Sequence, residues 1–139
     1  IEEGAKRFGS QAIVAAIDVK KIGNDYSVFI KGGKEKTELE GFLWCKQSEE
    51  LGAGEILLTS MDKDGTKDGY DLEFLKKLTD QVRIPVIASG GAGTKEHFLD
   101  AFKNANVDAC LAASLFHFKE LEINDLKNYL KENGIQIRG

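Results

Sequence analysis

Four short apolar runs, separated by stretches of helical periodicity, constrain the fold of this 139-residue chain more than any other feature. The runs cover residues 13–17, 55–60, 86–89 and 109–113, and apolar residues follow one another in them rather than alternating with polar ones. Continuous apolar strands are typical of a parallel sheet covered by helices, and parallel neighbours need connections long enough to hold a crossover helix. The sequence therefore predicts an α/β fold in which a helix follows each strand.

Helical periodicity fills most of the intervening sequence. Apolar side chains recur at helical spacing in residues 41–51, 72–82, 94–105 and 122–133, and a short helical turn is expected at 115–118. Residues 1–8 are expected to be the last turns of a helix, closed by Gly9 in a left-handed conformation. Residues 22–40 instead hold two strand-like segments around Gly32 and Gly33, which predicts a hairpin excursion after the first strand.

The carboxyl ends of the predicted strands help to separate two folds that share this order, the doubly wound sheet and the (β/α)8 barrel. Polar and small residues gather at those ends, namely Asp18, Thr59, Ser60, Asp64, residues 89–91, Ala113 and Ser114. Active sites of barrels occupy that face, and phosphate groups are held there by the loops after the seventh and eighth strands. The placement favours four βα units of the (β/α)8 TIM-barrel type.

Composition excludes several classes of function. With 42% hydrophobic and 30% charged residues, the chain has the profile of one globular unit, and its net charge of −4 with no basic run argues against nucleic-acid binding. No apolar stretch approaches membrane-spanning length and no export signal is evident, so we expect a cytoplasmic chain without membrane contact. Cys45 and Cys110 are expected to be reduced thiols. The absence of an initiating Met suggests a piece of a longer protein.

Residues 87–93 (IASGGAG) predict an anion site, because an apolar strand closes there into a glycine turn ahead of a helix. Residues 109–114 (ACLAAS) repeat this arrangement, so Gly90, Gly91, Ala113 and Ser114 are expected to share one phosphate through backbone N–H groups. Glycine permits the close backbone approach that such a site requires. The alternative is that these small residues only let strand and helix pack closely.

Five segments together resemble the C-terminal half of the cyclase subunit of imidazole glycerol phosphate synthase. They are residues 16–20 (AIDVK), 52–60 (GAGEILLTS), 62–71 (DKDGTKDGYD), 87–93 and 112–118 (AASLFHF). The resemblance covers essentially the whole chain and is specific in its combination, since glycine turns alone fit many phosphate-binding barrels. It implies that residues 1–139 form strands five to eight of a barrel built of two similar halves.

The resemblance also implies an activity, a lyase step of histidine biosynthesis. Ammonia from a glutaminase subunit would react with N′-phosphoribulosyl-formimino-AICAR phosphate to give imidazole glycerol phosphate and AICAR, without a cofactor. Such cyclases use two aspartates as general acid and base, one in each half-barrel, and Asp18 matches the one after strand five. The other belongs to a half that is absent here, so we expect this chain alone to be inactive and to need a complementary N-terminal half or self-association.

Each of the remaining candidate residues could have a functional role or only a structural one. Alternation along the first strand turns Asp18 into the barrel mouth with Val14 and Ala16, although it could be a cap or loop carboxylate. Thr59 and Ser89 could bind substrate hydroxyls or only satisfy their own backbone. The resemblance implies that Asp64 and Gly65 form a substrate loop, although they could be an ordinary Asp-Gly turn. It also implies that Glu55 gates an ammonia channel, although Glu55 could be a solvated residue at the start of its strand. His97 and His117 lack partners at metal-ligand spacing, so no metal is expected.

Two rival functions stay open. The first is the sister isomerase of the same pathway, a barrel with the same use of two aspartates and two phosphates. The second is a non-catalytic half-barrel that binds phosphate and serves in assembly, and the short length of the chain is its evidence. Residues 55–62, which end in Leu-Thr-Ser-Met-Asp, and the glycine turn look more like the cyclase than the isomerase.

Overall fold

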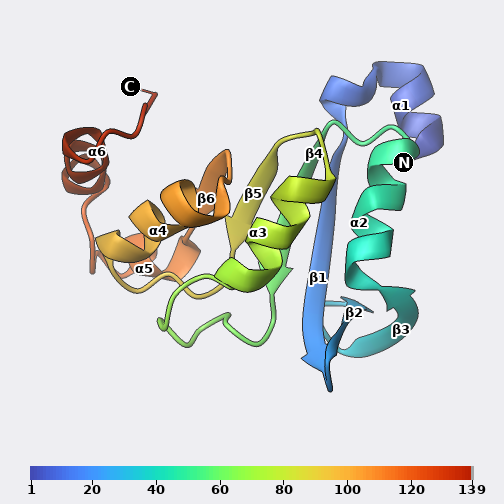
Figure 1. The fold of residues 1–139 in the computed structure, drawn as a ribbon, viewed down its shortest axis with the longest axis horizontal. Coiled ribbons are helices and arrows are strands. Elements are labelled where there is room, and N and C mark those ends of the chain that lie inside the picture. Colours follow the sequence, from blue (N-terminus) through green and yellow to red (C-terminus); the bar gives the residue numbers. More distant parts are fainter. Residues whose placement is uncertain (139) are drawn as a thin grey trace.

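A single six-stranded sheet organises the protein, in the order β3-β2-β1-β4-β5-β6 (Figure 1). The computed structural model describes residues 1–138, apart from the side chain of Ser114. The strands are β1 Val14–Ile22, β2 Asp25–Ile30, β3 Glu35–Glu40, β4 Glu55–Ser60, β5 Val86–Ser89 and β6 Ala109–Leu111. The helices are α1 Glu2–Phe8, α2 Gly41–Glu50, α3 Leu72–Gln81, α4 Lys95–Ala105, α5 Ala113–His117 and α6 Ile123–Glu132, with a 3-10 turn at Ser10–Ala12.

The four predicted strands are parallel neighbours, as the continuous apolar runs indicated. β1 pairs with β4, β4 with β5 and β5 with β6, all in parallel. Their carboxyl ends therefore meet at one edge of the sheet, opposite the end where α1 lies (Figure 1). The loops that follow β4, β5 and β6 emerge there side by side.

The hairpin differs from the prediction in how it joins the sheet. β1 does not end at residue 17 but continues to Ile22, because its second half pairs with β2 from Asp18 opposite Phe29 to Ile22 opposite Asp25. The exposed lysines at positions 20 and 21 hid this extension from an apolar pattern. Residues 14–17 of β1 pair only with β4, and no described strand pairs with their other side.

The two faces of the parallel strands are unequal. The side chains of Ala15, Ile17, Ile56, Leu58 and Ala88 are buried beneath the helices with Phe74, Leu78 and Phe98 from α3 and α4. The alternate residues point to the other face, where Val14 is 49% and Leu111 is 41% exposed. We call this second surface the open face. It corresponds to the predicted barrel interior, and no part of the described chain covers it.

Helix ends follow local capping rules at several places. The side chain of Asp71 accepts a hydrogen bond from the Phe74 N–H at the start of α3, as expected, and Glu40 accepts one from the Leu43 N–H at the start of α2. Gly9 was expected to be left-handed helical, but its φ of 86° is combined with a ψ of 148°. The chain therefore leaves α1 through an extended glycine and enters the 3-10 turn.

The end of the last strand was predicted too late. β6 stops at Leu111, and Ala113, expected within the strand, is instead the first residue of α5. Alanine has the highest helix propensity of the residues, so a small-residue segment after a short strand readily begins a helix.

Candidate active site

Three polar side chains form a line across the carboxyl ends of the strands. The ladder places Asp18 opposite Thr59 and Thr59 opposite Ser89, so the three lie in adjacent strands at one level. Their partial exposure and the burial of their strand neighbours place them on the open face. Paired residues of parallel strands project to the same side, so this face can present a carboxylate and two hydroxyls to one ligand.

The Asp18 carboxyl has altered acidity. Burial raises its pKa above the ordinary value, and the negative charge of Asp64, on the loop after β4, raises it further. A carboxyl with a raised pKa holds its proton nearer to neutral pH, which suits a group that gives and takes protons in turn. Asp18 therefore has both the position and the acidity required of a general acid or base.

A cavity of about 160 Å³ lies beside this line, at the ends of β5 and β6. Six of the predicted ligand-binding residues meet there, and the full lining consists of Asp64, Gly65, Lys67, Ser89, Gly90, Gly91, Ala92, Leu111, Ala112 and Ala113. We call it the glycine-turn cavity. Among the residues whose contacts the structure describes, none accepts a hydrogen bond from the N–H of Gly91 or Ala92. Free backbone donors in a small concave site suit an anion.

The glycine turn is packed directly on the loop after β4. Gly91 has a φ of 114°, and a Cβ at this position would overlap the carbonyl oxygen of Gly69. The Gly69 N–H donates to the Gly91 carbonyl at 2.7 Å. A side chain at position 91 would therefore separate the two segments that enclose the cavity, which is a physical reason for glycine there.

One predicted residue, Glu55, lies at the opposite end of the strands from this cavity. Glu55 is opposite Val14 at the amino ends of the strands, half-buried on the open face and a full strand length from Ser60. Ser114 belongs to α5 by its backbone, and its side chain lies outside what the structure describes. Thr59 is in the polar line but does not line the cavity.

Sequence reasoning missed three residues that build the site. Lys67 lines the cavity and forms an ion pair with Glu120 at 2.6 Å. The Tyr70 hydroxyl donates to the Leu111 carbonyl at 3.0 Å and so ties the loop to β6. His97 accepts hydrogen bonds from the turn itself. Only His97 left a usable signal, since it stands three residues after Thr94, the spacing at which a side chain can cap a helix reciprocally.

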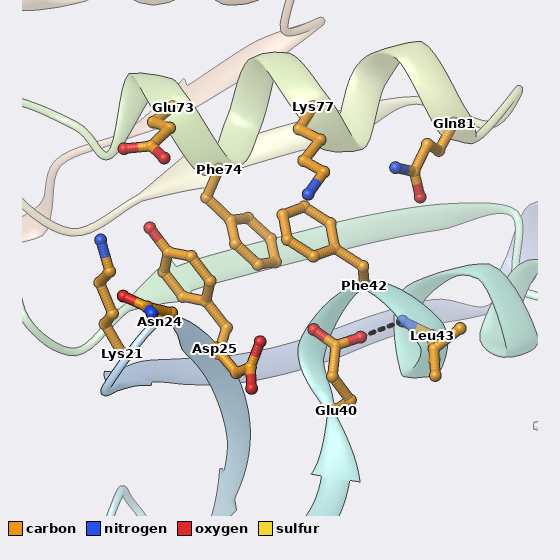
Figure 2. A pocket seen from close by; sticks show the side chains of 11 residues that line it. Lys21, Asn24, Asp25, Glu40, Phe42, Leu43, Glu73, Phe74, Lys77 and Gln81 are labelled. Carbon is orange, nitrogen blue, oxygen red and sulfur yellow. Dashed lines mark hydrogen bonds between the residues drawn. The ribbon is translucent and has the colours of Figure 1, made fainter.

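A second cavity, of about 350 Å³, lies between the hairpin, α2 and α3 (Figure 2). Phe42 and Phe74 stack at its base with ring centroids 4.1 Å apart, and the Lys77 ammonium lies 4.6 Å from the Phe42 ring (Figure 2). The cation lies over one ring of the stacked pair, which is an ordinary packing arrangement. This cavity contains none of the residues in the polar line or the glycine turn.

Other features of the described residues bear on earlier expectations. Cys45 is buried and Cys110 half-buried, and both are free thiols, as predicted. No group of three His, Cys, Asp or Glu side chains in the described chain is placed to hold a metal ion. None of the helices in the described part is long and apolar enough to cross a membrane.

Comparison with known proteins places the chain in a family. Residues 1–122 match the family model described as "Histidine biosynthesis protein". The chain is 60% identical over 138 residues to the "Imidazole glycerol phosphate synthase subunit HisF" of Campylobacter concisus (strain 13826), covering 99% of this chain and 54% of that protein. It is 58% identical over 139 residues to the protein of the same name from Hydrogenobaculum sp. (strain Y04AAS1), covering 99% and 55%.

The chain thus spans about half the length of the curated relatives that it matches. The expected fold class is confirmed, since the family has the TIM-barrel fold and the four parallel βα units are those of a barrel portion. Both relatives are named as a subunit, in agreement with the expectation of a multi-subunit enzyme. Because the family model matches residues 1–122, which is most of the chain, the chain belongs to the histidine biosynthesis protein family.

Proposed function

We propose that this chain supplies half of the cyclase active site of imidazole glycerol phosphate synthase. The complete enzyme would combine N′-phosphoribulosyl-formimino-AICAR phosphate with glutamine-derived ammonia and release imidazole glycerol phosphate and AICAR. Asp18 would be one of its two general acid/base aspartates, and the partner aspartate would come from a complementary N-terminal half-barrel. The names of both relatives support this assignment.

The observation that carries the proposal is the position of Asp18. Its carboxyl, with a raised pKa, stands in one line with Thr59 and Ser89, and Ser89 borders the glycine-turn cavity. A phosphate held in that cavity would anchor one end of an extended substrate on the open face. The middle of the substrate would then pass over the polar line, where Asp18 can exchange a proton with it.

Chemical roles follow from what each group can do. The N–H groups of Gly91 and Ala92 would bind a phosphate oxygen, and the Lys67 ammonium would offset its charge after leaving Glu120. Thr59 and Ser89 would orient substrate hydroxyls. Asp18 would accept or donate a proton during ring closure, a contribution of about 10²–10⁴ in rate for a well-placed group.

The open face requires a partner for this function. Val14, Leu57, Ile87 and Leu111 lie on it, and the edge of β1 at residues 14–17 is unpaired among the described strands. An apolar face next to a free strand edge favours association. A complementary half-barrel would cover both, and a second copy of the chain could cover them without supplying the second aspartate. A glutaminase subunit would deliver ammonia from the amino ends of the strands, where Glu55 lies.

Complementation tests the proposal. The chain would be mixed with the amino-terminal half of the Hydrogenobaculum relative, and ammonia-dependent formation of imidazole glycerol phosphate would be followed. We expect no turnover from the chain alone, turnover from the mixture, and loss of about 10²–10⁴ in rate for the Asp18→Asn mixture. Asp68→Asn is a matched control, since Asp68 is exposed on the same loop as Asp64 and lies outside the cavity.

Three other outcomes would contradict the proposal or a part of it. Turnover by the isolated chain at the rate of the mixture would refute the requirement for a second aspartate. A mixture that isomerises the precursor of the cyclase substrate, without cyclising it, would identify the sister isomerase. A mixture that assembles and binds phosphate but catalyses neither reaction would leave a non-catalytic half-barrel.

A further inference from the structure

Among the described side chains, His97 is the one that hydrogen-bonds to the end of the glycine turn. Its Nδ1 accepts hydrogen bonds from the backbone N–H groups of Gly93 at 2.9 Å and Thr94 at 3.2 Å. The residue is in the first turn of α4, at the position from which a Glu or Gln side chain usually returns to the helix start. A histidine performs the same task here with a ring nitrogen.

The same ring also contacts the loop after β4. A Cβ built on Gly69 would lie 3.3 Å from His97 Cδ2, so the imidazole packs against this glycine. Gly69 in turn donates to the Gly91 carbonyl at 2.7 Å. His97 therefore touches both segments that enclose the glycine-turn cavity, the loop after β4 and the turn after β5.

We infer that His97 is a positioning residue for anion binding and that it acts only while Nδ1 is unprotonated. By occupying the Gly93 and Thr94 amides, the ring fixes the turn so that the N–H groups of Gly91 and Ala92 stay available to the ligand. The inference rests on the proposed phosphate site and adds a proton-dependent control to it. An imidazolium has no acceptor nitrogen, so a proton on His97 breaks both hydrogen bonds at once.

Charged residues of both signs flank His97 on the two elements that its ring contacts. Those on α4 are Lys95, Glu96 and Asp100, and those on the loop before Gly69 are Lys67 and Asp68. Lys67 is paired with Glu120 at 2.6 Å. Histidine is the side chain type that ordinarily changes charge between about pH 5 and pH 8, so the test compares two pH values across that range.

Sulfate is a suitable probe, because it keeps its charge throughout this range while phosphate does not. Sulfate affinity of the 139-residue chain would be measured by calorimetry at about pH 8 and about pH 5.5, on either side of the histidine transition. We expect binding at the higher pH and binding about tenfold weaker at the lower pH, from the loss of two hydrogen bonds of ordinary strength.

Three variants separate positioning from a general effect on the fold. His97→Gln keeps an acceptor that does not titrate, so it should bind sulfate as the native chain does at the higher pH and lose the pH dependence. His97→Ala should bind about tenfold more weakly at both pH values. His117→Gln is the matched control, because it removes the other histidine of the chain and should keep the native pH dependence.

A spectroscopic measurement keeps the inference testable where a variant fails to fold. Nitrogen NMR of the native chain should show His97 with the proton on Nε2 and a bare Nδ1 at the higher pH. A proton on Nδ1 there would overturn the inference, and so would a pH dependence that survives in His97→Gln. Sulfate binding with no dependence on His97 refutes only this inference. No sulfate binding by the native chain at either pH would refute the phosphate site as well.

Discussion

Replacement of Gly91 by alanine probes the closest contact in the site. The residue has a φ of 114°, and an added Cβ would overlap the carbonyl oxygen of Gly69. A non-glycine residue in such a conformation costs about 1–3 kcal/mol. Since the contact is with backbone, the loop must move away, and this breaks the hydrogen bond between Gly69 and Gly91, which contributes about 0.5–1.5 kcal/mol.

Gly91→Ala should therefore lower the free energy of unfolding by about 1.5–4.5 kcal/mol, the sum of the strain and the lost hydrogen bond. Urea denaturation measures this loss, and calorimetry with phosphate measures the accompanying loss of binding. Gly134→Ala is the matched control, because Gly134 has a φ of 86° but no atom within 4 Å of an added Cβ. It should cost about 1–2 kcal/mol through backbone conformation alone and leave phosphate binding unchanged.

The comparison of the two variants decides the argument. A loss for Gly91→Ala no larger than that for Gly134→Ala would show that the contact with Gly69 carries no energy. Retained phosphate binding by a folded Gly91→Ala chain would show that the turn does not form the site. Either result would refute the reasoning from backbone approach.

Three further predictions concern acidity and buried polar groups. The raised pKa of Asp18 means that the folded state binds this proton more tightly than the unfolded state, so stability falls as pH rises from 3.8 through the folded pKa. Asp18→Asn should thus unfold at higher urea than the native chain at pH 7, and the difference should vanish at pH values below 3.8. Burial raises the pKa of the Cys45 thiol to about 12, so a thiol reagent should modify Cys45 at pH 8 only after unfolding. The buried Ser48 hydroxyl has no partner among the described residues, so Ser48→Ala should stabilise the chain by about 1 kcal/mol in urea denaturation, and a loss of stability would reveal a missed hydrogen bond.

The pattern of the sequence was sufficient for the parallel core and for the direction of its side chains. Continuous apolar runs predicted four parallel strands, and alternation along the first of them placed Asp18 on the same face as Val14 and Ala16. Both inferences depend on local geometry, because successive side chains of a strand project to opposite faces whatever the rest of the chain does. The glycine turn was recognisable for the same reason, since positive φ values are a local preference of glycine.

Contacts between segments that are distant in the sequence could not be predicted from the pattern of apolar and polar residues. The extension of β1 to Ile22 depends on pairing with β2, and the raised pKa of Asp18 depends on its burial and on the charge of Asp64. Lys67 meets Glu120 across 53 positions of sequence, and Tyr70 meets Leu111 across 41. A residue's own sequence neighbourhood determines its backbone preference and the face to which it points. Its partners are decided only when the strands assemble and bring their loops to one edge, because that assembly sets which distant groups come within hydrogen-bonding distance.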